Sequence, residues 1–308
     1  MSGFLSFTDE LGYISLLYPT AAHSLMRIAI FSTLLLITPI LTSAEPNQTD
    51  VEDIYDFIQK HSVLGLDKKV SSRTPYPKSE EAKVTRLANN ILQLDYEGFT
   101  VWFDCEKRGA IKFRYIAQHD TGRLKRYKKF HQDPSIPKEC QQKTYRGYGK
   151  GYDRGHLVPA NHLDHSITGI RQTNFMTNIL PQASAMNRGS WLRTEEITEC
   201  YRDIDELLII GGVIWGNNSD DDYFVKSHGV KTPDAYWKVI IRGVGQSEKA
   251  IAWIIPNSQA AKRKHLDNYL VTIDEIERIT GEKIPVADYA KHEKLSHSWM
   301  IPRGCNKG

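Results

Sequence analysis

Apolar and β-branched residues form three short runs in the second half of the chain. The runs are "LLIIGGVIWG", "AYWKVIIRG" and "AIAWIIP", at residues 207–216, 235–243 and 250–256, and each ends in Gly or Pro. Continuous apolar runs of this length are typical of strands that are buried on both faces. We therefore expect all three in a central sheet.

Alternating aromatic and polar positions mark an earlier pair of strands. The segment "FTVWFDCEKRGAIKFRYIAQH" at residues 99–119 predicts a hairpin with its turn at Lys107, Arg108 and Gly109.

Helical spacing appears at both ends of this strand-rich region. In "TDVEDIYDFIQKH", residues 49–61, the apolar positions share one face behind a capping candidate at Asp50. In "TIDEIERITG", Thr272 and Glu275 have the spacing of a capping box, and Gly281 is a typical stop signal. We expect a short helix in each segment.

The N-terminal part has the pattern of a secretory signal. Arg27 precedes an apolar run at residues 28–41, and small residues continue to Ala44, after which we expect cleavage. The run is shorter than the roughly 20 residues of a membrane-spanning helix, so no stable membrane insertion is expected after processing. Because a signal normally starts the chain, Met26 is an alternative start.

Composition is that of an ordinary globular protein. Of 308 residues, 40% are hydrophobic and 25% are charged, which is enough apolar material for a sizeable core. Removing residues 1–44 leaves 39 basic and 35 acidic residues, a mildly basic balance. Residues 45–308 show no composition break or repeat, so we expect one α/β or α+β domain.

Four cysteines remain after processing, and none forms a CxxC pair, which disfavours a zinc or redox motif. An even number in an exported chain predicts two disulfides, with three pairings open. Proximity along the chain favours Cys105 with Cys140 and Cys200 with Cys305.

One segment is distinctly basic. Residues 123–150 hold nine Lys or Arg residues against Asp133 and Glu139, with four aromatic residues between them. Such a stretch can follow a polyanion backbone and stack on bases. Taken alone, a solvated loop is the more frequent interpretation.

The stretch "GYDRGHLVPANH", residues 151–162, holds the candidate chemistry. Phosphodiester hydrolysis needs a base, neutralisation of the phosphate charge and help for the leaving oxygen. His156 is a candidate base and Arg154 a candidate phosphate ligand, and Gly155 would let the backbone approach a ligand.

A strand, a loop and a helix are expected downstream, in "NFMTNILPQASAMNRGSWLRTEEITECYR". We expect a strand at residues 175–180 that Pro181 ends, and a helix from near Asn187 past Tyr201. Asn187 can offer a neutral oxygen to a hard cation, and Glu195 can reach the cation's water shell from the same helix.

Together, "DRGHLVPANH", "NFMTNILPQASAMNRGSW" and "LRTEE" resemble the DNA/RNA non-specific endonuclease family of the ββα-metal superfamily. The resemblance extends more weakly over residues 90–285. It implies an α+β fold with a central, mainly antiparallel sheet flanked by helices. It also implies that His156 is the general base, that Asn187 is the magnesium ligand, that Glu195 fills the family's glutamate position, and that Asn178 supports the site.

The chain departs from the family pattern at two places. Gly189 follows Asn187 by two positions, from which we expect a flexible helix start. The family's basic-loop arginine has three candidate counterparts, Arg126, Lys128 and Lys129.

The signal pattern implies a secreted or periplasmic location. The resemblance implies an enzyme that uses Mg²⁺, with Mn²⁺ as a substitute, and cuts DNA and RNA with little sequence preference. Products should carry 5′ phosphates. Arg154 would contact phosphate or orient the site, and Asp153 has either a structural or a direct role. Family members are often dimers, which leaves a homodimer open.

Two other functions stay open. His156, His162 and His165 with Asp164 form an alternative zinc cluster for a different hydrolase, although their spacing disfavours it. An exported nucleic-acid-binding protein without catalysis is the second alternative.

Overall fold

The structure is a computed structural model, and it describes residues 81–87 and 90–307. The predicted signal peptide, the domain start at residue 45 and the helix at 49–61 lie outside these residues and stay predictions. Within the described residues, no helix is both long enough and apolar enough to cross a membrane.

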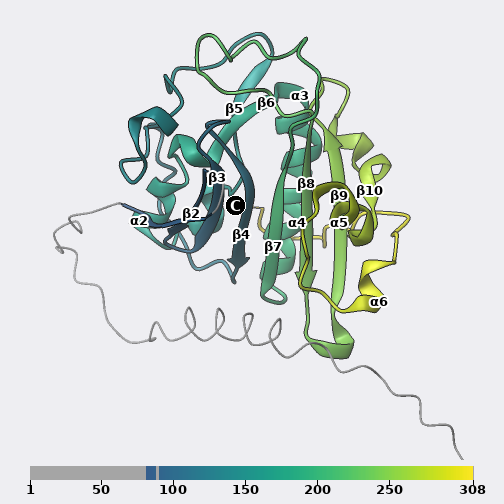
Figure 1. The fold of residues 1–308 in the computed structure, drawn as a ribbon. Helices are drawn as coiled ribbons and strands as arrows, with labels where there is room; N and C mark the ends of the chain where they lie inside the picture. The colour runs from purple at the N-terminus through teal and green to yellow at the C-terminus, as the bar shows by residue number, and fades with distance from the viewer. Residues whose placement is uncertain (1–80, 88–89, 308) are drawn as a thin grey trace, which may run out of the picture. The chain divides into compact units, whose positions relative to one another are not determined.

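The larger of two described sheets is antiparallel throughout and has eight strands (Figure 1). Their spatial order is β1, β2, β3, β4, β7, β8, β9, β10. The strands are β1 (Lys83–Arg86), β2 (Ile91–Tyr96), β3 (Phe99–Asp104), β4 (Gly109–Ala117), β7 (Leu207–Ile214), β8 (Ala235–Arg242), β9 (Lys249–Pro256) and β10 (Leu270–Val271).

The three apolar runs are β7, β8 and β9, as expected, and both of their faces are covered. Because side chains alternate between the faces of a strand, Tyr236 and Ile240 of β8 enter the larger core cluster. Trp237, Val239 and Ile241 enter a second cluster on the opposite face.

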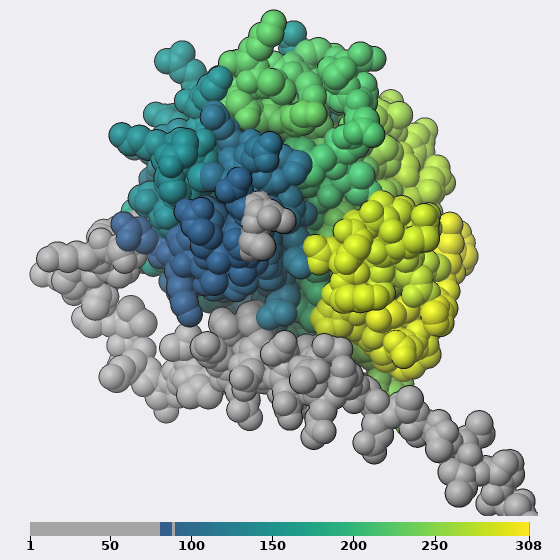
Figure 2. Space-filling view, viewed as in Figure 1, coloured from purple at the N-terminus to yellow at the C-terminus, as the bar shows by residue number. Residues whose placement is uncertain are grey.

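Helix α5 (Ile273–Thr280) closes this second cluster with Ile273 and Ile276. The hydroxyl of Thr272 accepts a hydrogen bond from the Glu275 amide, and Gly281 ends the helix at φ 73°, so the capping prediction is confirmed. Figure 2 shows this side of the molecule, where the yellow C-terminal residues gather beside the green residues of the later strands. The short helix α6 (Asp288–Lys291) follows.

The predicted hairpin is confirmed as β3 and β4, and both predicted disulfides are present. Cys105 at the hairpin turn is bonded to Cys140, and Cys200 is bonded to Cys305. The first bond holds the basic segment against the hairpin, and the second holds the C-terminal tail against a helix.

The candidate motif lies on a ββα unit on the other face of the large sheet. Strands β5 (Tyr152–His156) and β6 (Ile179–Ala183) pair antiparallel as a two-stranded sheet. The chain is then helical from α3 (Ser184–Met186) through a π-helical segment, Asn187–Trp191, to α4 (Leu192–Arg202). The remaining helix, α2 (Ile167–Gln172), lies between the two strands in sequence.

The strand predicted at 175–180 was placed too early. Residues Met176–Asn178 form a 3₁₀ turn, and the strand begins at Ile179 and continues through Pro181. Proline has no backbone N–H to donate, and a two-stranded ribbon leaves one side of each strand unpaired, so Pro181 is accommodated. The helix accordingly starts at Ser184 rather than near Asn187.

Gly155 and Gly189 both allow close packing. This differs from the predicted ligand approach at Gly155 and from the predicted flexible helix start at Gly189. A Cβ on Gly155 would lie 2.1 Å from the side-chain oxygen of Gln182, so this glycine admits a neighbouring side chain and not a ligand. A Cβ on Gly189 would lie 2.8 Å from the backbone nitrogen of Arg263. The Ser190 hydroxyl donates to the Lys262 carbonyl at 2.8 Å. The start of the helix is therefore packed tightly and not flexible.

Candidate active site

A cleft with a volume of about 530 Å³ opens beside β5 and α4. Five of the eight predicted site residues line it: Arg126, Arg154, His156, Asn187 and Glu195. The other lining residues are Asp153, Pro159, Ala160, Asn161, Arg188, Leu192, Glu196, Glu199 and Lys307. Lys128, Lys129 and Asn178 are not among them.

The His156 imidazole is 7% exposed and is held in one orientation by Asn174. Its Nε2 lies 2.8 Å from the Asn174 Oδ1, and the Asn174 amide nitrogen donates to the Tyr127 carbonyl at 2.5 Å. With that nitrogen engaged, the amide oxygen faces the ring and can only accept. Nε2 therefore carries the proton, and Nδ1 is the basic nitrogen.

The pKa of His156 is lowered to about 4. Burial is the largest cause, the positive charges of Arg126 and Arg154 add to it, and the hydrogen bond to Asn174 works against it. An imidazole with this pKa is neutral at physiological pH and can accept a proton.

Asn178 lies beneath the site rather than in it. Its side chain is fully buried, its oxygen accepts from the Val158 amide, and its nitrogen donates to the carbonyls of Val158 and Thr173. These bonds hold the chain that follows His156 against the turn that precedes β6. This geometry fits the predicted supporting role.

Asp153 ties β5 to the start of the helix. Its carboxylate accepts from the Asn187 side-chain nitrogen at 3.0 Å, from two Arg188 nitrogens at 2.8 Å each, and from the Ser184 hydroxyl at 3.0 Å. Partial burial acts to raise its pKa, but the hydrogen bonds from Arg188, Asn187 and Ser184 hold that pKa below the ordinary value. Asp153 thus positions Asn187 through its side chain, and the Asn187 oxygen accepts no hydrogen bond from the described residues.

Glu195 presents a carboxylate that is not committed to another side chain. Unlike Glu196 and Glu199, it forms no ion pair or hydrogen bond with the described residues. Burial raises its pKa, and the charges of Lys238, His162 and Arg126 oppose that effect.

Lys238 is fully buried near Glu195, and no motif in the sequence indicates it. Its ammonium donates to the Thr194 hydroxyl at 2.8 Å and lies 3.7 Å from the centroid of the Trp191 ring. Burial lowers its pKa to about 8, against the effect of the Glu195 charge. A lone lysine inside the apolar run "AYWKVII" is the signal that could have revealed it, because lysine is almost never fully buried without a partner.

Of the three basic-loop candidates, only Arg126 lines the cleft. Arg154 enters from β5, with its guanidinium carbon 4.0 Å from the centroid of the Phe130 ring and Nη1 donating to the Tyr145 carbonyl at 2.9 Å. The motif did not indicate Asn174 either, although it is the first residue of the quoted stretch "NFMTNILPQASAMNRGSW". Its contact with His156 spans 18 residues, and no local spacing rule indicates it.

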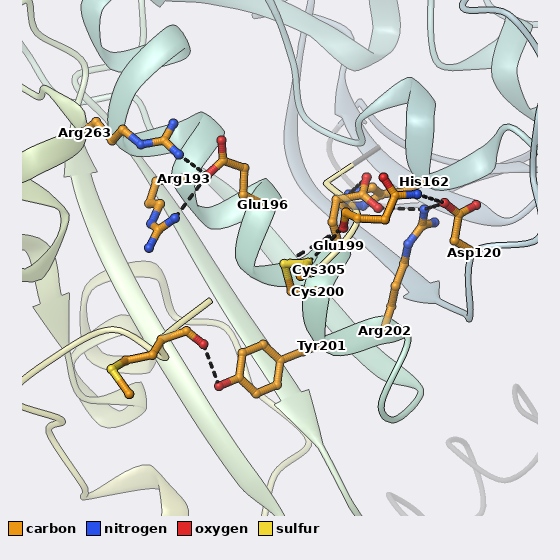
Figure 3. The surroundings of a disulfide bond; sticks show 12 residues. Asp120, His162, Arg193, Glu196, Glu199, Cys200, Tyr201, Arg202, Arg263 and Cys305 are labelled. Carbon is orange, nitrogen blue, oxygen red and sulfur yellow. Dashed lines mark hydrogen bonds and ion pairs between the residues drawn. A yellow bond between two sulfur atoms is a disulfide. The ribbon is translucent and has the colours of Figure 1, made fainter. Parts of the chain in front are cut away.

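The alternative zinc cluster is not assembled. The described residues contain no group of three His, Cys, Asp or Glu side chains that could hold a metal ion. His162 points instead into a buried network, with Nδ1 2.7 Å from the Tyr115 hydroxyl and Nε2 2.9 Å from Glu199 (Figure 3). Arg202 completes this network with ion pairs to Glu199 and Asp120.

A neutral buried histidine, two arginines and an uncommitted carboxylate thus meet in one cleft, beside a ββα unit. The model of the DNA/RNA non-specific endonucleases matches residues 79–292. The chain belongs to the DNA/RNA non-specific endonuclease family. The ββα-metal fold predicted from the motif is therefore confirmed.

Relatives within the family occur in animals and bacteria. Over 235 residues the chain is 25% identical to the mitochondrial nuclease EXOG of Mus musculus. This alignment covers 68% of this chain and 62% of the relative. It is 26% identical to mitochondrial endonuclease G of Bos taurus over 161 residues, 49% of this chain and 54% of the relative. It is 29% identical to a nuclease of a Nostoc species over 175 residues, 52% and 60% respectively. The matches span about half to three fifths of these relatives' lengths.

Proposed function

We propose that this protein is an exported, magnesium-dependent endonuclease that hydrolyses the phosphodiester bonds of DNA and RNA and leaves 5′ phosphates. The observation that carries the proposal is His156, held by Asn174 with Nδ1 as its basic nitrogen, in a cleft it shares with Asn187 and Glu195. Family membership and the names of the relatives support it.

The chemistry of the side chains fits a hard divalent cation. Asn187 and Glu195 offer oxygen atoms, and cysteine, the soft ligand, occurs only in disulfides. Mg²⁺ commonly takes one or two protein oxygens and keeps several waters, so Asn187 would hold it directly and Glu195 through water. Mn²⁺, which also suits oxygen ligands, would substitute. When bound, the ion supplies positive charge where negative charge develops on the phosphate and on the leaving oxygen.

The chain's own residues perform the remaining steps. His156 Nδ1 accepts a proton from the attacking water, and Asn174 keeps the ring oriented while it does so. Arg126 and Arg154 bind phosphate oxygens, and their guanidinium groups can do so through two parallel hydrogen bonds. Because these contacts fall on phosphate and not on base edges, sequence preference should be weak. Lys128 and Lys129 would act only as outlying cations of the same loop.

We propose that the protein is exported because two disulfides are typical of proteins in an oxidising compartment. The secreted or periplasmic location and the signal peptide belong to this proposal, as does a homodimer.

The test is cleavage of supercoiled plasmid and of RNA by the purified protein, with Mg²⁺, with Mn²⁺ or with EDTA. We expect cleavage with either metal and none with EDTA. His156→Ala should lower the rate by at least about 100-fold, the lower range for a general base, and should leave DNA affinity within about twofold.

Three outcomes would contradict the proposal. Cleavage that survives EDTA or requires zinc would indicate the other hydrolase. Binding without cleavage by the wild type would indicate a non-catalytic binding protein. Equal loss of cleavage and binding in His156→Ala would remove His156 as the base.

A further inference from the structure

The C-terminal tail lies outside the part of the chain that the family model matches. That match ends at residue 292, and the tail then runs along α4. The Trp299 ring lies 5.0 Å from the Tyr201 ring between centroids, and the Tyr201 hydroxyl donates to the Met300 carbonyl at 3.1 Å. These contacts bring the tail to the helix that carries Glu195.

A covalent bond then fixes the end of the tail. Cys305 is bonded to Cys200 of α4, with 5.5 Å between their Cα atoms (Figure 3). The Asn306 side chain donates to Asp120 at 3.2 Å, and Asp120 pairs with Arg202 of the same helix at 3.3 Å. Two residues span at most about 7 Å of extended chain, so the residue after Asn306 must stay close to α4.

That residue is Lys307, and it lines the cleft. Its side chain is exposed, and its ammonium forms no ion pair with any part of the chain that the structure describes. Partial burial acts to raise the pKa of Glu196, but the hydrogen bonds from Arg263 and Arg193 and the charges of Arg263 and Lys307 hold that pKa below its ordinary value, so Lys307 lies close to this carboxylate.

The charges on the α4 side of the cleft indicate a role for Lys307. Helix α4 presents three carboxylates to the cleft, and these would repel a polyanion. Glu196 is neutralised by Arg193 and Arg263, and Glu199 by Arg202 (Figure 3). Arg126 and Arg154 reach the cleft from elements other than α4. On the α4 side, the ammonium of Lys307, which comes from the tail, is therefore available to bind a phosphate.

We propose that the disulfide-tethered tail is a substrate-binding element, in which Lys307 binds a backbone phosphate of the nucleic acid beside the one that is cut. The proposal rests on the nuclease function above. It adds a phosphate contact from residues that the family match does not include, and it gives the Cys200–Cys305 bond the role of placing that contact.

The first experiment compares Lys307→Ala with Arg303→Ala, which removes the same charge from the same tail at a residue that does not line the cleft. Equilibrium binding of a fluorescent 20-base-pair duplex is measured between about 50 and 200 mM salt, and kcat and KM are measured on the same duplex. Lys307→Ala should raise Kd and KM about 3- to 10-fold and reduce the slope of log K against log salt by about 0.9, one phosphate contact. It should leave kcat within about twofold, and Arg303→Ala should match the wild type.

Binding and slope that match the wild type in Lys307→Ala, or equal losses in both variants, would overturn the assignment to Lys307. A wild type that binds DNA but does not cut it would refute the nuclease function instead, and the binding comparison would still test Lys307.

The second experiment removes the tether with Cys200→Ser and Cys305→Ser together. This variant should show the binding defect of Lys307→Ala, and adding Lys307→Ala to it should cause little further loss, as expected for two changes that act through one contact. Thermal unfolding is followed in parallel, so that binding is compared at a temperature where all variants are folded. A folded, tether-free protein that binds DNA like the wild type would refute the role of the disulfide.

Discussion

Replacing Asn174 by Asp should convert the nuclease into one that is inactive in mild acid. The substitution places a carboxylate where a neutral amide oxygen now lies 2.8 Å from His156 Nε2. With the two charge centres about 4 Å apart and an effective dielectric constant of about 20, their attraction is about 4 kcal/mol. Since one pKa unit corresponds to about 1.4 kcal/mol, the pKa of His156 should rise by about three, from about 4 to about 7.

The assay is kcat/KM on a fluorogenic oligonucleotide from pH 4 to pH 9, because this parameter reports the base of the free enzyme. A base works only when deprotonated, so activity rises with pH through its pKa. At pH 5.5 the wild type should stay near its plateau, whereas Asn174→Asp should fall to about 3% of its own plateau, the neutral fraction of a group with pKa about 7.

Asn174→Ala is the matched control, since it removes the acceptor without adding charge. Its acid limb should stay near pH 4 or lie lower, because the hydrogen bond that His156 donates to Asn174 raises the pKa of His156 in the wild type. Its plateau should fall by up to about 100-fold because the ring loses its orientation, within the range attributed to a general base. A folded Asn174→Asp variant whose acid limb stays near pH 4 would refute either the orientation of the ring or the role of His156.

Two further predictions concern buried charges. Lys238→Met removes the charge that most lowers the pKa of Glu195, so this pKa should rise further and about tenfold more Mg²⁺ should be needed for half-maximal cleavage. An unchanged metal requirement would show that Lys238 does not act on Glu195. Arg202→Met removes the arginine that pairs with Glu199, which is 2% exposed, and should lower the free energy of unfolding in urea by about 3–5 kcal/mol. Arg193→Met, at a more exposed pair on the same helix, should cost less than about 1 kcal/mol, and equal costs would contradict the argument.

The sequence predicted the central sheet well because its strands are buried on both faces. Apolar runs ended by Gly or Pro located β7, β8 and β9 directly. The order of cysteines along the chain was enough to pair them, since both bonds join consecutive cysteines.

The rules of local structure fail at β6, where they predict that Pro181 ends the strand. Proline is excluded only from strands paired on both sides, and β6 has one partner, β5. That pairing is a tertiary fact which no window of sequence contains.

Within the site, the motif indicated which residues would meet and missed those that hold them. Asn174 is separated from His156 in the sequence by α2, and Lys238 lies on a strand 43 residues after Glu195. Such residues are specified by packing between elements, whereas the motif records spacing within one ββα unit. Whether Arg126 or one of the two nearby lysines lines the cleft likewise depends on the conformation of the loop. Three hydrogen bonds between the loop and residues 174–176 hold that conformation.

The consecutive pattern of the disulfides has a consequence for biosynthesis. A chain that enters an oxidising compartment N-terminus first presents Cys105 and then Cys140, 35 residues later, so an oxidase that joins thiols in order of appearance makes the first bond correctly. Cys200 must then stay a thiol until Cys305, 105 residues later, has emerged. Under the proposed export, both bonds therefore form correctly when thiols are joined in the order in which they emerge, without a later exchange of partners.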